Sequence, residues 1–213
     1  MEILIKKARN EISKPSLAIT QQYLDVNIID ITDGEYTIER IAKFNENTII
    51  YFKISEEKFY LGITIDNSTS EVIHSFIENG NKCYLSCVSY NLSLEQLSKL
   101  TKLKYTSGWT KGDFRKDLQS KYDFTRINFE LLTSECFDTE NAINELLKIL
   151  ETDIPGINNL SSKSDACISI CKHQYISSNA GLHIDLKTIN RLAKLNLPLD
   201  IDTYIVGAKI LDE

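Results

Sequence analysis

The stretch Tyr84–Arg115 reads YLSCVSYNLSLEQLSKLTKLKYTSGWTKGDFR and contains the only tryptophan of the 213-residue chain. Over residues 82–88, cysteine and leucine at every second position predict a strand with two distinct faces. Ser93 and Gln96 then have the spacing of a capping box, the reciprocal pair of hydrogen bonds that starts a helix. Leucines at positions 94, 97, 100 and 103 predict a helix whose apolar stripe packs against a sheet or another helix.

Residues 106–115 (TSGWTKGDFR) combine two glycines, several charges and Trp109, a composition that predicts a loop. Two interpretations of this loop stay open. In the first, Trp109 closes the edge of the domain and its indole N–H bonds to backbone. In the second, the loop is a partner-binding patch, because tryptophan and arginine dominate interface energetics. That patch consists of Trp109, Lys111, Asp113 and Arg115.

From residue 82 onward the predicted order is strand, helix, strand, helix, strand, helix, strand. The strands are expected at 82–88, 124–132, 166–176 and 199–205, and the helices at 93–103, 138–151 and 185–195, with an additional strand at 181–184. Asp138 is the expected N-cap of the second helix, and Asp153 and Pro155 should stop it. Helices with one apolar stripe each belong on one face of a mostly antiparallel sheet. The pattern therefore predicts an α+β fold, a two-layer sandwich of ferredoxin-like type.

The first 80 residues predict a strand-rich α+β module that extends the same sheet. Strands are expected at 48–54 and 59–65, joined by a SEEK hairpin loop. A short strand is expected around Ile3 and Ile5, and helices at 15–24 and 35–44. Residues 71–78 fit either a strand or a helix, and the turn at 79–81 should form a hairpin. We therefore expect two domains, 1–80 and 81–213.

Charge and cysteine content limit the class of protein. The formal net charge is -6, and Lys and Arg are scattered among a surplus of Asp and Glu, which argues against a nucleic-acid partner and suits a basic protein partner. The N-terminus lacks the apolar core of a signal peptide, and no window has the length of a membrane span. The five cysteines then read as free thiols. We therefore expect a cytosolic protein.

Two pairs of cysteines have a spacing that suggests two halves of a metal site: Cys83 with Cys87, and Cys167 with Cys171. On a strand, positions four apart share a face but lie roughly 13 Å apart, which is too far for one tetrahedral zinc ion. A zinc site would need the two strands to be neighbours, with His173 as a further ligand. We expect no metal and no cofactor.

Two side-chain groups near the C-terminus are candidates for chemistry or for binding. Cys171 and His173 share a strand face, and a thiolate nucleophile needs a base nearby. Asp200, Asp202 and Tyr204 share a face of the last strand, where paired carboxylates serve acid-base chemistry, a divalent ion or simply a charged surface. We assign Asp200, Asp202 and Tyr204 to the partner-binding surface. The enzymatic alternative is a site near Cys171, His173, Asp202 and Tyr204.

Four segments together resemble a bacterial family, the domain of unknown function 4279. They are YLSCVSYNLSLEQLSKL at 84–100, SGWTKGD at 107–113, ENAINELLKILE at 140–151 and GLHIDLKTINRLAKLNLPLDIDTY at 181–204. The resemblance covers residues 82–207. It implies that Trp109 and Gly112 are the family's tryptophan and glycine after the first helix, and that Asp202 and Tyr204 are its Asp-x-Tyr strand.

The resemblance implies no catalytic activity. Proteins of this type are associated with bacterial toxin and immunity loci. Together with the acidic balance, this favours a non-enzymatic cytosolic immunity protein that masks the active site of a partner toxin, such as a nuclease.

Overall fold

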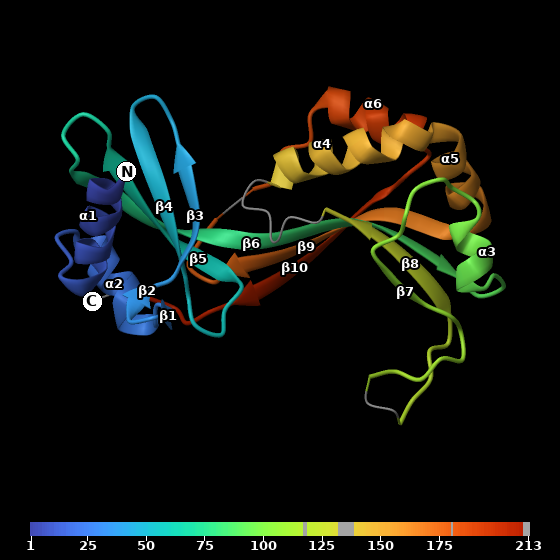
Figure 1. Ribbon diagram of the computed structural model, residues 1–213, viewed down its shortest axis with the longest axis horizontal. Coiled ribbons are helices and arrows are strands. Elements are labelled where there is room, and N and C mark those ends of the chain that lie inside the picture. Colours follow the sequence, from blue (N-terminus) through green and yellow to red (C-terminus); the bar gives the residue numbers. More distant parts are fainter. Residues whose placement is uncertain (117–118, 132–138, 180, 211–213) are drawn as a thin grey trace. The chain divides into compact units, whose positions relative to one another are not determined.

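The computed structural model describes residues 1–116, 119–131, 139–179 and 181–210 (Figure 1). Two compact units divide the chain: unit 1 comprises Met1–Gly80, His173–Ala180 and Thr203–Glu213, and unit 2 comprises Asn81–Lys172 and Gly181–Asp202. The division falls within three strands, β6 (Val72–Ser89), β9 (Asp165–Tyr175) and β10 (Leu199–Val206). Helices and a mostly antiparallel, curled sheet are both present, so the predicted α+β class is confirmed.

Unit 1 contains an antiparallel meander in the order β3-β4-β5-β6, formed with the first part of β6. Its elements are α1 (Glu2–Ser13), α2 (Ala18–Val26), β1 (Ile31–Thr32), β2 (Glu35–Tyr36), β3 (Ile38–Lys43), β4 (Asn47–Lys53) and β5 (Phe59–Asp66). Isoleucines and aromatic residues of β4 and β5 build the core, because such side chains pack well on a pleated surface. The predicted strands at 48–54 and 59–65 and the hairpin between them are confirmed.

Three predictions for unit 1 are wrong. The N-terminal segment is helix α1, because Ile5, Ala8 and Ile12 at helical spacing face the core. Residues 35–44 contain strands β2 and β3, not a helix, since β3 pairs along β4. No hairpin turn occurs at 79–81: β6 continues through these residues, and the buried Asn79 accepts a 2.9 Å hydrogen bond from the Tyr175 N–H of β9.

In unit 2 the sheet order is β7-β8-β6-β9-β10. Its further elements are α3 (Leu94–Ser98), β7 (Ser107–Trp109), β8 (Thr125–Glu130), α4 (Thr139–Leu150), the 3-10 helix η1 (Glu151–Asp153), α5 (Ile154–Lys163) and α6 (Leu186–Lys194). Figure 1 shows α4, α5 and α6 over one face of this sheet. Their apolar side chains share a core with alternate residues of the strands, such as Leu85, Ile127 and Ile168.

The capping box predicted at Ser93 is confirmed. Ser93 accepts a hydrogen bond from the Gln96 N–H, and the Gln96 side chain accepts one from the Ser93 N–H, which completes the capping box of α3. Asp185 caps α6 by accepting a 2.7 Å bond from the Thr188 N–H. The expected N-cap Asp138 lies outside the described residues.

Several boundaries in unit 2 differ from the prediction. Helix α3 ends at Ser98, not at 103, because Asp153 accepts hydrogen bonds from Thr101 and Lys102 that hold the chain outside the helix. Helix α4 ends at Leu150, close to the predicted end at 151, but the chain continues through η1, and Asp153 is the N-cap of a further helix, α5. Pro155 fits the first turn of α5, where its missing N–H has no intrahelical partner to lose. Residues 181–184 form no strand.

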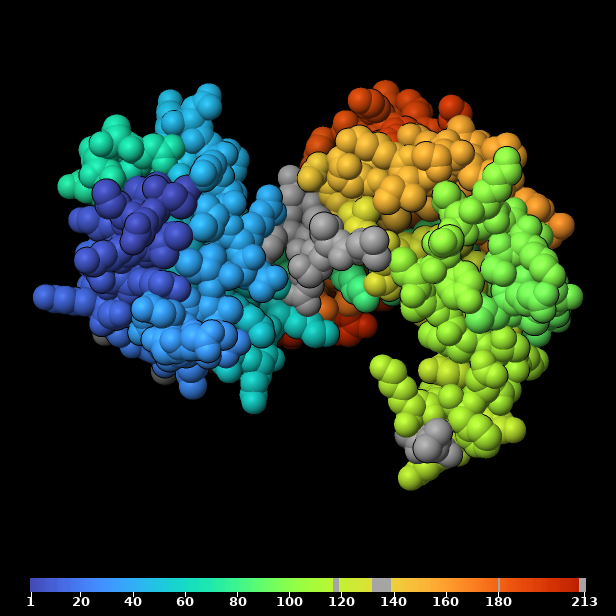
Figure 2. Space-filling model, in the orientation of Figure 1, coloured from blue at the N-terminus to red at the C-terminus, as the bar shows by residue number. Residues whose placement is uncertain are grey.

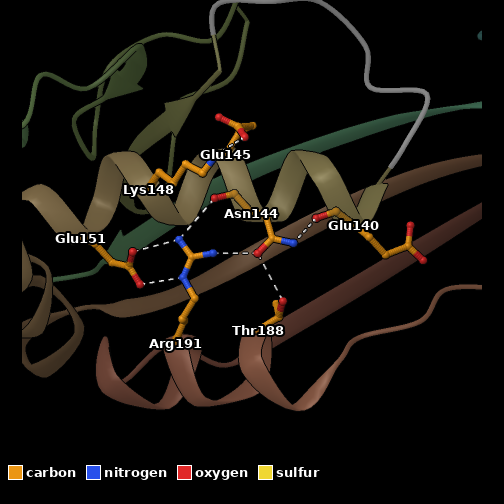
Figure 3. Close-up of polar contacts among 7 residues, drawn as sticks. All are labelled: Glu140, Asn144, Glu145, Lys148, Glu151, Thr188 and Arg191. Carbon is orange, nitrogen blue, oxygen red and sulfur yellow. Dashed lines mark hydrogen bonds and ion pairs between the residues drawn. The ribbon is translucent and has the colours of Figure 1, made fainter. Parts of the chain in front are cut away.

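A polar network joins α4 to α6 (Figure 3). The Arg191 guanidinium donates to both carboxylate oxygens of Glu151, at 2.7 and 2.9 Å, and a third nitrogen donates to Asn144 Oδ1 at 2.7 Å. Asn144 in turn donates to the Glu140 carbonyl and lies 3.4 Å from the Thr188 hydroxyl. The bidentate pair therefore ties α6 to η1, and the bond to Asn144 ties α6 to α4.

No helix in the described part of the chain is both long enough and apolar enough to cross a membrane.

Candidate functional site

Residues 110–116 and 119–122 form the two strands of an arm between β7 and β8. The Gly112 N–H donates to the Tyr122 carbonyl at 2.8 Å, the Tyr122 N–H donates to the Asp113 carbonyl at 2.9 Å, and the Arg115 N–H donates to the Ser120 carbonyl at 2.8 Å. Phe114 and Lys121 form an antiparallel bridge between these bonds. The arm projects from the sheet of unit 2 (Figures 1 and 2). The predicted loop is therefore a hydrogen-bonded hairpin with exposed side chains.

Trp109 lies at the base of the arm and is held by aromatic contacts. Its ring stacks on Tyr122 with centroids 4.3 Å apart and planes 18° apart, and it lies 5.8 Å from the ring of Phe124. The indole N–H is buried and has no hydrogen-bond partner among the described residues. The backbone bond expected by the first interpretation of Trp109 is therefore missing from this part of the chain.

The charged residues predicted for the loop lie on the arm. Lys111 and Arg115 are exposed, and the Arg115 guanidinium lies 5.2 Å from the centroid of Tyr122. Asp113 is also exposed, but its carboxylate accepts a 2.8 Å bond from the Thr110 N–H and so supports the turn. By sequence, residues 110–122 contain four basic and two acidic residues, a formal charge of +2 in a chain of net charge -6. The arm is thus a basic extension of an acidic protein.

The sheet of unit 2 has a second face, opposite α4, α5 and α6, which we term the polar face. Alternation along β8 places Ile127 and Phe129 in the core and Arg126, Asn128 and Glu130 on the polar face. Residues of β6 and β9 continue it: Tyr84, Ser86, Cys167 and Ser169. This face adjoins the base of the arm, since Trp109 pairs with Arg126 in the register of β7 and β8.

Arg126 occupies the centre of a cluster on this face. Its guanidinium carbon lies 5.7 Å from the Trp109 ring and 5.6 Å from the Tyr84 ring. Its Nε donates to Asn128 Oδ1 at 2.9 Å, and Asn128 Nδ2 donates to the Ser107 hydroxyl at 3.0 Å. We term these five residues the Arg126 cluster. Cation–π contacts and hydrogen bonds hold the guanidinium in one orientation.

The polar face has an acidic end at β10. Asp200 and Asp202 are exposed there. Cys167 lies on the neighbouring strand β9. Burial raises the pKa of its thiol, the negative charge of Asp200 raises this pKa further, and the positive charge of Arg126 lowers it. The polar face of unit 2 therefore carries the Arg126 guanidinium on β8 together with Glu130, which is paired with Lys82 at 3.1 Å, and the exposed carboxylates of Asp200 and Asp202 on β10.

Tyr204, the last residue of the predicted partner-binding surface, belongs to unit 1. Its ring stacks on His173 with centroids 5.4 Å apart and planes 16° apart. The structure thus gathers Trp109, Lys111 and Arg115 on and beside the arm and places Asp200 and Asp202 at the other end of the sheet of unit 2.

The alternative sites have less geometric support. Cys83 and Cys87 belong to the core beneath the helices, whereas Cys167 and Cys171 alternate with the core residues Ile168 and Ile170 and face the other way. Within the described ranges, no group of three or more His, Cys, Asp or Glu side chains could hold a metal ion. The neighbouring strands β6 and β9 therefore do not bring the two cysteine pairs into one zinc site.

The thiols are expected to differ strongly in reactivity. Burial raises the pKa of Cys87 to about 12, so at pH 8 this thiol is almost entirely protonated and a poor nucleophile. We expect iodoacetamide to leave Cys87 unmodified in the folded protein at pH 8 and to modify it rapidly in urea. Mass spectrometry of tryptic peptides measures both. Modification of Cys87 at the rate of a free thiol without urea would contradict its placement in the core.

The Arg126 cluster was not predicted from the sequence. A signal was present, because residues 125–130 (TRINFE) alternate between polar and apolar from Arg126 onward, which predicts that Arg126, Asn128 and Glu130 share one face. The contacts with Tyr84 and Trp109 depend on the pairing of β8 with both β6 and β7, which no local pattern specifies.

A model of the family described as Domain of unknown function (DUF4279) matches residues 78–206, which is more than half of the chain. The chain belongs to this family. The resemblance inferred from the sequence over 82–207 is thereby confirmed. The DUF4279 match includes the arm, the Arg126 cluster and β10. No curated protein and no solved structure matches the chain.

Proposed function

We propose that this DUF4279 protein is a non-enzymatic binding protein of the immunity type, which neutralises a partner toxin by covering its active site. The projecting arm is the observation that supports the proposal most. It is held by backbone hydrogen bonds and an aromatic base, and it presents Phe114, which is 58% exposed and lies 4.8 Å from Lys121 Nζ. A hydrogen-bonded hairpin whose described residues include an exposed aromatic ring and cations has the composition of an interface anchor.

The polar face adds a second point of contact. A partner that lies against this face meets cations near Trp109 and carboxylates at Asp200 and Asp202. Two patches of opposite sign fix the orientation of a partner, and the acidic balance of the whole chain attracts a basic partner at long range. A nuclease-type toxin has a basic cleft, so we propose that Asp200 and Asp202 approach its cationic groups. The proposed location is the cytosol.

The fold is compatible with this arrangement. We propose that residues 81–213 follow the ferredoxin-like two-layer scheme, with helices on one face of the sheet. The packing of α4, α5 and α6 against a single face supports it. In that scheme the other face is available for a partner.

Co-expression with the protein encoded beside this gene tests the proposal. We expect the wild-type chain to restore growth of cells that produce that neighbour and to co-purify with it. The double substitution Phe114→Ala and Arg115→Glu should weaken binding by roughly 10- to 100-fold, because an aromatic ring and an arginine are both lost from the anchor. Isothermal titration calorimetry of the purified proteins measures the loss.

Lys99→Glu is the matched control, because Lys99 is an exposed cation of unit 2 at the C-terminus of α3 and is not part of the arm. It should leave the affinity unchanged. Failure of the wild-type chain both to bind the neighbouring product and to restore growth would refute the immunity function.

A further inference from the structure

Arg126 differs from the other partly buried arginines of the chain. Arg9 forms an ion pair with Glu35 at 2.9 Å, and Arg191 forms one with Glu151 at 2.7 Å. For Arg126, the described residues provide no carboxylate oxygen within 4.0 Å. A partly buried guanidinium without a counter-ion is unusual, since burial of an unpaired charge is unfavourable.

The hydrogen bonds of Arg126 use only part of its donor capacity. A guanidinium has five N–H groups. In the described structure Nε donates to Asn128 Oδ1 at 2.9 Å, and Nη2 has a long contact of 3.4 Å with the Tyr84 hydroxyl. The aromatic rings of Trp109 and Tyr84 lie against the group without using its N–H donors. The cluster thus orients the guanidinium and leaves it donors for a bidentate acceptor.

We propose that Arg126 binds a side-chain carboxylate of the partner, carried on an acidic segment of polypeptide that lies along the base of the arm. This inference rests on the protein-binding function proposed above and specifies the chemistry of one contact within it. The exposed cations Lys111 and Arg115 extend the same positive charge along the arm. In this proposal the partner presents basic groups to Asp200 and Asp202 and an acidic group to Arg126.

A carboxylate fits the polar face better than the phosphates of a nucleic acid. A nucleic-acid strand carries a negative charge at every nucleotide, so a strand that crossed this face would meet Asp165, Asp200 and Asp202 after leaving Arg126. A polypeptide segment can place one carboxylate at Arg126 and other groups elsewhere. The net charge of -6 also opposes the long-range attraction of a polyanion.

The fluorescence of Trp109 provides a direct test of carboxylate binding at Arg126. Trp109 is the only tryptophan of the chain, and it lies beside Arg126 and stacks on Tyr122, so its fluorescence reports on this cluster and on the base of the arm. The probe is an acetylated, amidated octapeptide of alternating Glu and Leu, with a Gln and Leu octapeptide as its neutral match. We expect saturable quenching by the Glu peptide and at least about tenfold weaker binding of the Gln peptide.

Substitutions of Arg126 test whether this residue is responsible for binding of the Glu peptide. Arg126→Gln should weaken binding of the Glu peptide about tenfold or more, and Arg126→Lys, which keeps the charge but loses the planar fork, should give an intermediate loss. Arg40→Gln removes the same charge from an exposed position on β3 and should change nothing. Circular dichroism verifies that each variant is folded. Equal affinities for wild type and both Arg126 variants would overturn the proposal, as would tighter binding of a thymidine octanucleotide than of the Glu peptide.

The proposed function and this inference fail separately. If the neighbouring gene product binds wild type and Arg126→Gln with equal affinity, the carboxylate contact is refuted and the immunity function stands. If the Glu peptide binds in an Arg126-dependent manner but no gene product binds, the carboxylate site stands and the immunity function is refuted.

Discussion

Replacing Asp153 with alanine is expected to lower the free energy of unfolding by about 3 kcal/mol, because it removes several hydrogen bonds to one carboxylate. Asp153 Oδ2 accepts from the Thr101 hydroxyl and from the Lys102 N–H, both at 2.7 Å, and Oδ1 accepts from the Gly156 N–H at 3.2 Å. The side chain thus caps α5 and also ties down the segment between α3 and β7. Urea unfolding followed by circular dichroism measures the loss.

The glycine at 156 belongs to the same arrangement. A Cβ atom at this position would lie 2.0 Å from Asp153 Oδ2 and 2.8 Å from the Thr101 Cα, so only glycine allows this approach. Glu95→Ala is the control for Asp153→Ala: Glu95 lies exposed in the first turn of α3, and within the described ranges its carboxylate forms an ion pair with Lys99 alone. It should leave the urea midpoint unchanged. An equal loss in both variants would contradict the assignment.

The contribution of Asp153 should depend on pH. Hydrogen bonds from Lys102, Thr101 and Gly156 to the carboxylate lower its pKa in the folded state. For a carboxyl group with a lowered folded-state pKa, the stabilisation is complete above the unfolded-state pKa, about 4, and is lost as pH falls through the folded-state value. The difference in stability between wild type and Asp153→Ala should therefore shrink below about pH 4.

A second large effect is expected for Arg191→Ala, which should destabilise the protein by about 2–3 kcal/mol, because it leaves two partly buried acceptors without their donor. Glu151 loses a bidentate partner, and Asn144 Oδ1 loses its 2.7 Å bond (Figure 3). Arg191→Lys should recover only part of the loss, since an ammonium cannot reproduce the fork. Urea unfolding of the three proteins provides the comparison.

Figure 3 also contains the control, the Lys148 and Glu145 pair on the exposed side of α4. Lys148→Ala should cost less than about 1 kcal/mol, because exposed ion pairs contribute little. The bond from Arg191 is the main cause of the lowered pKa of Glu151, so the Arg191 effect should also diminish as pH falls below the ordinary range of a glutamate. Equal losses for Lys148→Ala and Arg191→Ala would show that the network does not join α4 to α6.

Local patterns predicted the elements whose side chains alternate or repeat cleanly. The capping box at Ser93 and the β4–β5 hairpin both depend on neighbours within a few residues, and both are confirmed. Asn79-Gly80-Asn81 reads as a turn locally, yet it is strand because Asn79 bonds to β9, almost a hundred residues later in the chain. Long-range bonds of this kind override local propensity.

In the candidate site, too, residues that depend on local composition were predicted, and residues that depend on long-range strand pairing were not. Trp109, Lys111 and Arg115 were predicted from composition, because glycines and charges around a tryptophan indicate an exposed segment. Arg126 was not predicted, although its position on the polar side of β8 follows from alternation. Its relation to Trp109 arises from the pairing of β7 with β8, and β7 is a strand of only three residues that the composition of the segment concealed.

Amide hydrogen exchange of the chain, alone and in complex with the product of the neighbouring gene, tests most directly whether the arm and the polar face of unit 2 bind the partner. The account predicts slower exchange in the complex at residues 107–116, 119–126 and 199–202, with little change in α4 and α6. Protection confined to α1, α2 and the β3–β4 hairpin, or to the outer surfaces of α4 and α6, would contradict it.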